Sequence, residues 1–230
     1  MDKKVKQLSK SIVSAVKFLF ASGVMEHSGH GNISARINNG EHKVIFTGGR
    51  GSLRDLTADE LVVVSMDGKV LEGNLEAVGA EVVQMHLAIY KARKSVGSII
   101  HTHSPHATAF AMAHEPLPCD YESLLRFEVG EPIPVTDWAP RGSDESIEAI
   151  LTVLREHPSL PAMLLGNHGL LAFGSDPQAA AELVVAMEED AEAILQARVL
   201  GGAKQLPADA LQRERQQMAR FRASQSGCEV

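Results

Sequence analysis

Cysteine is nearly absent from this chain of 230 residues, in which Cys119 and Cys228 are the only two. Two cysteines are too few for a disulfide framework or for a zinc site built from cysteine ligands. Apolar runs long enough to span a bilayer are also lacking, and the charged, amphipathic N-terminal stretch does not match a signal peptide. We therefore expect a cytoplasmic protein with no membrane partner.

Basic residues are in the minority, since 22 Lys and Arg face 29 Asp and Glu, which gives a net charge of −7. Nucleic-acid binding requires a basic surface, so this balance excludes nucleic acid as an expected partner. A linker rich in Pro, Gly or Ser is missing as well. The sequence therefore predicts one domain over residues 1–204, followed by a polar C-terminal tail over residues 205–230 with room for a short helix.

Helical and extended patterns alternate along the chain. Apolar residues spaced by three and four predict helices over residues 5–23, 79–93, 143–154 and 176–201. Apolar or β-branched runs predict strands over residues 43–47, 61–66, 69–71, 95–104 and 162–173, the last of these broken in the middle. The glycine-rich stretch 26–36 is interpreted as a loop, and Glu188, Glu189 and Asp190 are interpreted as a mostly solvated helix face. One α/β domain accounts for this mixture of elements.

Two histidines separated by one residue end the run 95–104. Because alternate residues of a strand share a face, His101 and His103 can reach the same point, which is a spacing typical of metal ligands. His168 lies at a glycine-flanked corner, Asn167–His168–Gly169, where a third imidazole would be accessible. Neutral imidazole suits Zn²⁺, Mn²⁺, Fe²⁺ or Co²⁺, and catalytic sites typically use three protein ligands. A satisfied polar pair at a strand end is the alternative for the first two histidines.

Two glycine loops form a second candidate feature. Gly31 and Asn32 lie in the first loop, and Thr47 and Gly48 open the second. Backbone N–H groups can approach an anion closely where no Cβ intervenes, so these loops could hold a phosphate or a carboxylate. A pair of ordinary turns is the alternative that the residues alone leave open.

Five motifs in one order together give a resemblance to a known family. They are Gly31–Arg36, Thr47–Gly48, the helix ending at Arg93, His101–His103 and Asn167–Gly169. Over most of its length the chain resembles the class II aldolase/adducin family. The resemblance implies a single-domain, three-layer α/β/α fold around a central, largely antiparallel sheet. It also implies a small-molecule substrate and a homotetramer with a metal site near each subunit interface.

Carried over by position, the resemblance implies that His101, His103 and His168 bind a divalent metal, with Zn²⁺ expected and Mn²⁺, Fe²⁺ or Co²⁺ as alternatives. In family aldolases the fourth ligand is an acidic residue on the preceding helix, and the matching position here is Val82. Glu81, one residue earlier, is the nearest carboxylate. We therefore expect Glu81 to be the fourth metal ligand.

The resemblance also assigns catalytic roles. The acidic ligand doubles as the base in family aldolases, so Glu81 is the expected base. A tyrosine from a neighbouring subunit acts as the acid, and Tyr121 lies close to the matching position. His86 is interpreted as a packing or surface-contact residue of its helix, and His106 and His114, which lack ligand-like spacing, are interpreted as structural residues.

Substrate anion binding is implied for Gly31, Asn32, Thr47 and Gly48, which match the phosphate-binding loops of family aldolases. A pair of serines that precedes the acidic residue in those aldolases is replaced here by Gly79–Ala80. Each missing hydroxyl removes one hydrogen bond to a phosphate oxygen. Anion binding is thus expected, while a preference for phosphate over carboxylate is left open.

Metal-dependent retro-aldol cleavage is the expected reaction. A divalent metal would stabilise the enolate formed when a carbon–carbon bond of a ketose or ketose phosphate breaks. Alternatives on the same fold are a 4-epimerase, which shares this step, a decarboxylase of a keto or hydroxy acid, and a non-haem-iron oxygenase. A non-catalytic interaction domain like the adducin head loses the metal ligands, so three intact histidines argue against it.

Overall fold

A sheet of eight strands runs through the part of the chain that the computed structural model describes, which is residues 3–25, 29–37, 42–48 and 52–226. Its strands are Gly31–Ile37 (β1), Lys43–Phe46 (β2), Val62–Ser65 (β3), Val70–Glu72 (β4), Ser98–Thr102 (β5), Val135–Thr136 (β6), Ala162–Leu165 (β7) and Gly169–Gly174 (β8). Their order is β4–β3–β2–β1–β5–β8–β7–β6, and all neighbours are antiparallel except β6 and β7. The predicted, largely antiparallel sheet is confirmed.

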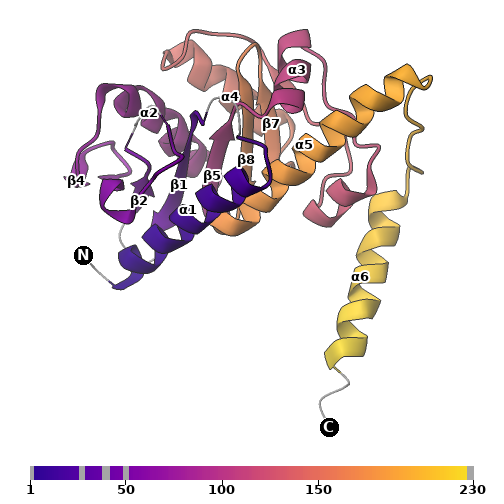
Figure 1. The fold of residues 1–230 in the computed structure, drawn as a ribbon, viewed down its shortest axis with the longest axis horizontal. Helices are drawn as coiled ribbons and strands as arrows, with labels where there is room; N and C mark the ends of the chain where they lie inside the picture. Colours follow the sequence, from indigo (N-terminus) through magenta and orange to yellow (C-terminus); the bar gives the residue numbers. More distant parts are fainter. Residues whose placement is uncertain (1–2, 26–28, 38–41, 49–51, 227–230) are drawn as a thin grey trace.

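Helices cover both faces of this sheet (Figure 1). One face carries α1 (Lys3–Ala21), α3 (Pro105–Ala113) and α5 (Pro177–Val199), and the other carries α2 (Ala77–Ala92) and α4 (Asp144–Glu156). Each side buries its own apolar cluster. On β5, Ile100 belongs to the α1/α5 cluster and Ile99 to the α2/α4 cluster, so the strand is buried on both faces. Burial of each such side chain stabilises the fold by roughly 1.5–3 kcal/mol. The three-layer α/β/α arrangement of one domain is confirmed.

Helices α4 and α5 begin where the sequence predicts. The Ser143 hydroxyl accepts a hydrogen bond from the Ser146 backbone N–H (3.1 Å) at the start of α4. The Asp176 carboxylate accepts one from the Ala179 N–H (3.0 Å) at the start of α5, where Pro177 takes the first helical position. These caps satisfy N–H groups that have no partner inside their helix.

Two sequence interpretations are wrong. The stretch interpreted as a loop contains β1, because residues 31–37 pair with β2 on one side and with β5 on the other. Glu188 and Asp190 are buried, with 7 % and 0 % of their surface exposed, and do not form a solvated face. Glu188 instead accepts the backbone N–H groups of His106 and Ala107, both at 2.9 Å, at the start of α3. Helical periodicity could not predict this contact because it joins distant parts of the chain.

The C-terminal region contains α6 (Ala210–Ser226), which projects from the body of the domain (Figure 1). Its first half lies next to a short 3₁₀ helix, η2 (Glu122–Phe127), and Arg215 pairs with Glu128 just beyond it (2.6 Å). A second 3₁₀ helix, η1, spans Ala58–Glu60. Among the described residues, no helix combines the length and apolar character needed to cross a membrane.

Candidate functional site

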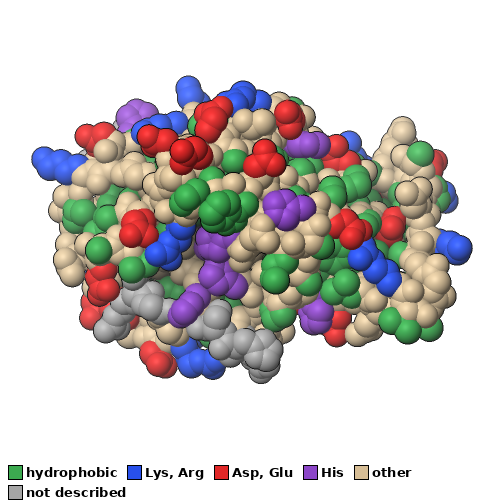
Figure 2. Space-filling model, turned by 90° about the horizontal axis from the view of Figure 1, so that it is seen from above, with side chains coloured by type: hydrophobic (Ala, Val, Ile, Leu, Met, Phe, Trp, Pro, Cys, Tyr) green, Lys and Arg blue, Asp and Glu red, His purple; other side chains and the backbone are tan. Residues whose placement is uncertain are grey.

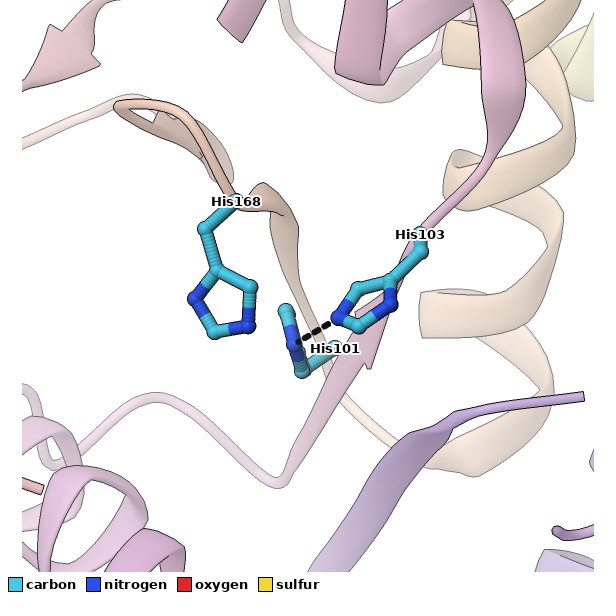
Figure 3. A group of neighbouring side chains, drawn as sticks. All are labelled: His101, His103 and His168. Carbon is cyan, nitrogen blue, oxygen red and sulfur yellow. Dashed lines mark hydrogen bonds between the residues drawn. The ribbon is translucent and has the colours of Figure 1, made fainter. Parts of the chain in front are cut away.

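Three histidines from neighbouring strands meet at one point (Figure 3). His101 lies in β5, and His103 directly follows that strand. His168 lies in the turn between β7 and β8, where Asn167 adopts the left-handed conformation (φ +56°) and the His168 N–H donates to the Leu165 carbonyl (2.9 Å). Because β5 pairs with β8, the turn and the end of β5 lie together. The structure thus brings together the three histidines that the sequence analysis singled out.

The imidazoles are close enough to share one ion. The Nε2 atoms of His101 and His103 are 3.1 Å apart, and one ligand nitrogen from each histidine lies within 4.8 Å of the other two. Ring centroids are separated by 4.6 to 5.0 Å. Gly169 makes this approach possible, since a Cβ there would lie 2.4 Å from the Thr102 carbonyl oxygen and 3.0 Å from the His103 ring.

The cluster is held in the neutral state that metal ligation requires. His101 Nδ1 donates to the Leu170 carbonyl oxygen (2.8 Å), so its Nε2 carries the lone pair that faces the other histidines. Burial lowers the pKa of His101 well below its usual range, and lowers the pKa of His103 to about 4. Burial and the charge of Arg141 also lower the pKa of His168. Three neutral imidazoles aimed at one point are consistent with a divalent metal site.

A cavity of about 210 Å³ opens beside the cluster, between α2, α4, the β7–β8 turn and the segment that follows β6. His101 and His168 line it, and so do Arg141 and the exposed Trp138. Figure 2 looks onto this part of the molecule, where histidine side chains gather near the centre of the face with basic and hydrophobic side chains beside them. A small polar molecule in this cavity would contact the histidine cluster directly.

Glu81 lines the same cavity but lies outside the histidine cluster. Its side chain is 49 % exposed, and its Oε2 accepts a hydrogen bond from Arg141 Nη2 at 2.9 Å. Val82, at the position that holds the acidic ligand in family aldolases, is buried and also lines the cavity. The sequence analysis missed Arg141 because it lies in an irregular segment with no motif around it. The predicted role of Glu81 as ligand and base stays a prediction.

Two of the four predicted anion-binding residues, Gly31 and Asn32, lie next to the cluster. Gly31 passes so close to β5 that a Cβ there would lie 2.4 Å from the His101 carbonyl oxygen, and Asn32 pairs with His101 across the two strands. The Thr47 hydroxyl accepts the Ile33 N–H (3.1 Å), which fixes the second loop against β1. Gly48 is left-handed (φ +55°), as its residue type allows. Residues 26–28 and 49–51, which complete the two glycine loops, lie outside the described residues.

Gly79 ties the second loop to the start of α2. A Cβ at position 79 would lie 2.5 Å from the Gly48 carbonyl oxygen, a contact that the backbone cannot accommodate unchanged. A serine at position 79, as in family aldolases, therefore does not fit this backbone. Packing against Gly48 thus accounts for the absence of a serine at position 79, whereas Ala80 is exposed.

The remaining predicted residues lie elsewhere. Tyr121 is 43 % exposed at the start of η2 and is not among the residues lining the cavity, so its predicted role as acid stays a prediction. His86 lies on the buried face of α2 and is fully buried, so of its two predicted roles packing fits and surface contact does not. His30 escaped the sequence analysis, although its ring lies 6.4 Å from that of His103. The one sequence signal for His30 is its position directly before Gly31 in the first glycine loop.

Comparisons with known proteins agree with this architecture. The sequence model of the Class II Aldolase and Adducin N-terminal domain matches residues 10–195. An L-ribulose-5-phosphate 4-epimerase of Salmonella paratyphi C is 32 % identical over 173 residues, which cover 70 % of this chain and 73 % of that protein. A 5-deoxy-D-ribulose 1-phosphate aldolase of Bacillus thuringiensis is 28 % identical over 204 residues, which cover 88 % and 91 %. A solved L-fuculose 1-phosphate aldolase superposes with a TM-score of 0.80 at 24 % identity, covering 93 % of this chain and 96 % of that one.

Proposed function

Because the chain belongs to the class II aldolase/adducin family, we propose that it is a metal-dependent lyase that cleaves a ketose or ketose phosphate in a retro-aldol reaction. The observation that carries the proposal is the cluster of His101, His103 and His168, whose ligand nitrogens lie within 4.8 Å of one another beside a cavity. A purely structural role would not need three neutral imidazoles aimed at one point. This also argues against a non-catalytic, adducin-like domain.

The three histidines would hold the metal, with Zn²⁺ as the first choice and Mn²⁺, Fe²⁺ or Co²⁺ as alternatives. When bound, such an ion acts as a Lewis acid toward the negative charge that develops on the substrate oxygens. Glu81 would complete the site after exchanging its present partner, Arg141. Arg141 is then released toward the cavity, where its guanidinium can pair with an anionic group of the substrate.

Two proton transfers are assigned to side chains of the protein. The Glu81 carboxylate takes the proton from the substrate hydroxyl as the carbon–carbon bond breaks. Tyr121 returns a proton to the other fragment from a neighbouring subunit of a homotetramer, because the residue is exposed and does not line the cavity of its own chain. Subunits carrying Tyr121→Phe, mixed with subunits carrying His168→Ala, should then regain activity in hybrid assemblies. Mixtures without activity would place the acid within the same chain.

The anionic end of the substrate is assigned to Asn32 and to the backbone of Gly31, Thr47 and Gly48. With a glycine forced at position 79, this pocket lacks the serine hydroxyls of family aldolases. Charge-assisted hydrogen bonds are each worth roughly 1.5–3 kcal/mol, so the loss of two lowers the advantage of a phosphate dianion about a hundredfold or more. The substrate is thus a weakly held sugar phosphate or a smaller molecule that bears a carboxylate.

Metal analysis of the untagged protein, coupled to retro-aldol assays over a panel of ketose phosphates and keto acids, tests the proposal. We expect close to one divalent ion per chain and an aldehyde product from at least one ketose. Protein that binds no divalent metal and turns over no member of the panel would overturn the proposal in favour of a binding domain.

A 4-epimerase is the second candidate, because the relative from Salmonella paratyphi C has that activity in its name and is 32 % identical. Epimerisation re-forms the carbon–carbon bond that cleavage breaks, so its product is an epimer and no aldehyde accumulates. The same substrate panel also identifies a decarboxylase by the CO₂ that it releases and a non-haem-iron oxygenase by the O₂ that it consumes.

A further inference from the structure

A continuous chain of hydrogen bonds between buried side chains runs behind the site, from α2 to β1. Tyr90 OH lies 2.9 Å from Ser34 Oγ, which in turn lies 2.7 Å from His86 Nδ1. On the other side of the same ring, His86 Nε2 lies 2.5 Å from Asn32 Oδ1. Tyr90, Ser34 and His86 expose 1 % of their surface or less, and Asn32 exposes 7 %. The chain thus ends at the side chain assigned to the substrate anion.

The orientation of the Asn32 amide, with Oδ1 facing His86 Nε2, implies one direction for each bond in this chain. Burial lowers the pKa of His86 to about 3, so the ring is neutral and carries one N–H. An amide oxygen only accepts, so the proton lies on Nε2 and is donated to Asn32 Oδ1. Nδ1 then accepts from the Ser34 hydroxyl, and Ser34 Oγ accepts from Tyr90 OH. Burial raises the pKa of Tyr90, which keeps this last hydroxyl protonated.

We propose that His86 is a positioning residue that fixes the orientation of the Asn32 side-chain amide. Its Nε2–H engages Oδ1 and thereby leaves the two N–H groups of Nδ2 as the hydrogen-bonding groups that the amide offers to a ligand. This inference rests on the proposed function, in which Asn32 binds the substrate anion. An amide turned by 180° would direct its oxygen toward that anion and repel it.

The position of Asn32 makes its orientation matter for the site. Asn32 pairs with the metal-ligand candidate His101 across β1 and β5, so an anion bound by its amide lies beside the histidine cluster. Ser34 and Tyr90 hold the tautomer of His86, and the His86 ring also makes a T-shaped contact with the Phe46 ring, with ring centroids 5.3 Å apart. A ring locked in one tautomer and one orientation can select one of two amide orientations.

Two His86 variants separate positioning from packing. His86→Leu fills much of the space but has no N–H to donate, whereas the amide of His86→Gln can donate to Asn32 Oδ1. We expect His86→Leu to weaken the binding of inorganic phosphate to the zinc-loaded protein roughly tenfold or more, as Asn32→Ala does, with zinc content unchanged. His86→Gln should retain most of the affinity. The double variant Asn32→Ala/His86→Leu should be no weaker than Asn32→Ala alone, because both changes remove one interaction.

Ser98→Ala is the matched control. Ser98 is also buried on a neighbouring strand and donates to the Ser34 carbonyl oxygen (2.7 Å), but it is not part of the series of side-chain hydrogen bonds from Tyr90 to Asn32. This variant should bind phosphate like the wild type. If His86→Leu does not fold, Tyr90→Phe tests the same chain from its far end and should weaken phosphate binding less. Phosphate affinity that is unchanged in the folded His86→Leu or in Tyr90→Phe, while Asn32→Ala weakens it, would overturn the inference.

A measurement on the unaltered protein separates this inference from the proposed function. The ¹⁵N chemical shifts of the His86 ring should show the Nε2–H tautomer at neutral pH, and the Nδ1–H tautomer would overturn the inference. If Asn32→Ala leaves phosphate binding unchanged, the proposed anion pocket fails. The ¹⁵N shifts of the His86 ring then still show whether Nε2–H is present to orient the Asn32 amide.

Discussion

The two halves of the candidate site differ in how far a single chain assembles them. In the histidine half, three neutral imidazoles already lie within ligand distance of one another at the adjoining ends of two paired strands. In the carboxylate half, Glu81 lies at the start of α2, half-exposed and paired with Arg141. Neutral imidazole rings can cluster without charge repulsion, whereas the charged Glu81 carboxylate is stabilised by an ion pair with the nearby Arg141 guanidinium. Under the proposed function, metal binding would therefore rest on rigid elements, whereas catalysis would require Glu81 to exchange its partner Arg141.

The largest expected effect tests the histidine half. Replacing His103 or His168 by alanine should abolish activity and lower the affinity for the metal about a hundredfold or more. A site of three ligands cannot lose one and keep its geometry. The fold should persist, since both side chains are only partly buried. Metal analysis and circular dichroism measure the two effects. His157→Ala, which alters a histidine outside the cluster that pairs with Glu131, should change neither. Full metal occupancy in the His103 and His168 variants would refute the site.

The next effect tests the carboxylate half. Glu81→Gln keeps the size of the side chain but removes the base, so we expect kcat to fall roughly 10²–10⁴-fold while most of the metal stays bound. Glu148→Gln is a matched control, because Glu148 is also an exposed carboxylate paired with an arginine, Arg155. Turnover near the wild-type rate in Glu81→Gln would place the base elsewhere, with Glu76 as the next carboxylate along the chain.

The same comparison explains what the sequence could predict. The spacing of His101 and His103 on a strand, and the glycine-flanked corner at His168, are local patterns, and regular elements convert them directly into geometry. The partner of Glu81, Arg141, lies in an irregular segment, and local sequence does not predict where the side chains of such a segment lie. The structure of β1 was missed for a related reason, since glycines at 29 and 31 resemble a turn while the pairing with β2 and β5 decides the conformation.

A smaller effect tests the contact between the second glycine loop and the start of α2, the helix that also carries Glu81. Gly79→Ser should lower the free energy of unfolding by about 1–3 kcal/mol, because its Cβ would meet the Gly48 carbonyl oxygen. Ala80→Ser, at an exposed position, should stay within about 0.5 kcal/mol of the wild type and can add one hydroxyl near the anion. Chemical denaturation and phosphate titration measure both variants. A stable Gly79→Ser protein that binds phosphate more tightly would show that the loop yields easily.

The smallest effect concerns pH and the histidine half alone. The folded protein holds His103 with a pKa of about 4 and lowers the pKa of His168, while both groups return to about 6.5 on unfolding. Below pH 6.5 the unfolded chain therefore binds more protons than the folded one, so stability is full above that pH and falls as the pH drops toward 4. Buried His86, with its pKa lowered to about 3, adds a contribution of the same sign.

For the metal-free protein, each of these histidines should lower the free energy of unfolding by at most about 1.4 kcal/mol per pH unit in this range. His168→Ala removes one titrating group from the cluster and leaves His86 in place, so its stability should fall less steeply between pH 6.5 and 5. Urea denaturation of both proteins across this range measures the difference. Identical slopes would mean that His168 is protonated as readily in the folded state as in the unfolded chain, and the histidine half would then not be held neutral in advance of metal binding.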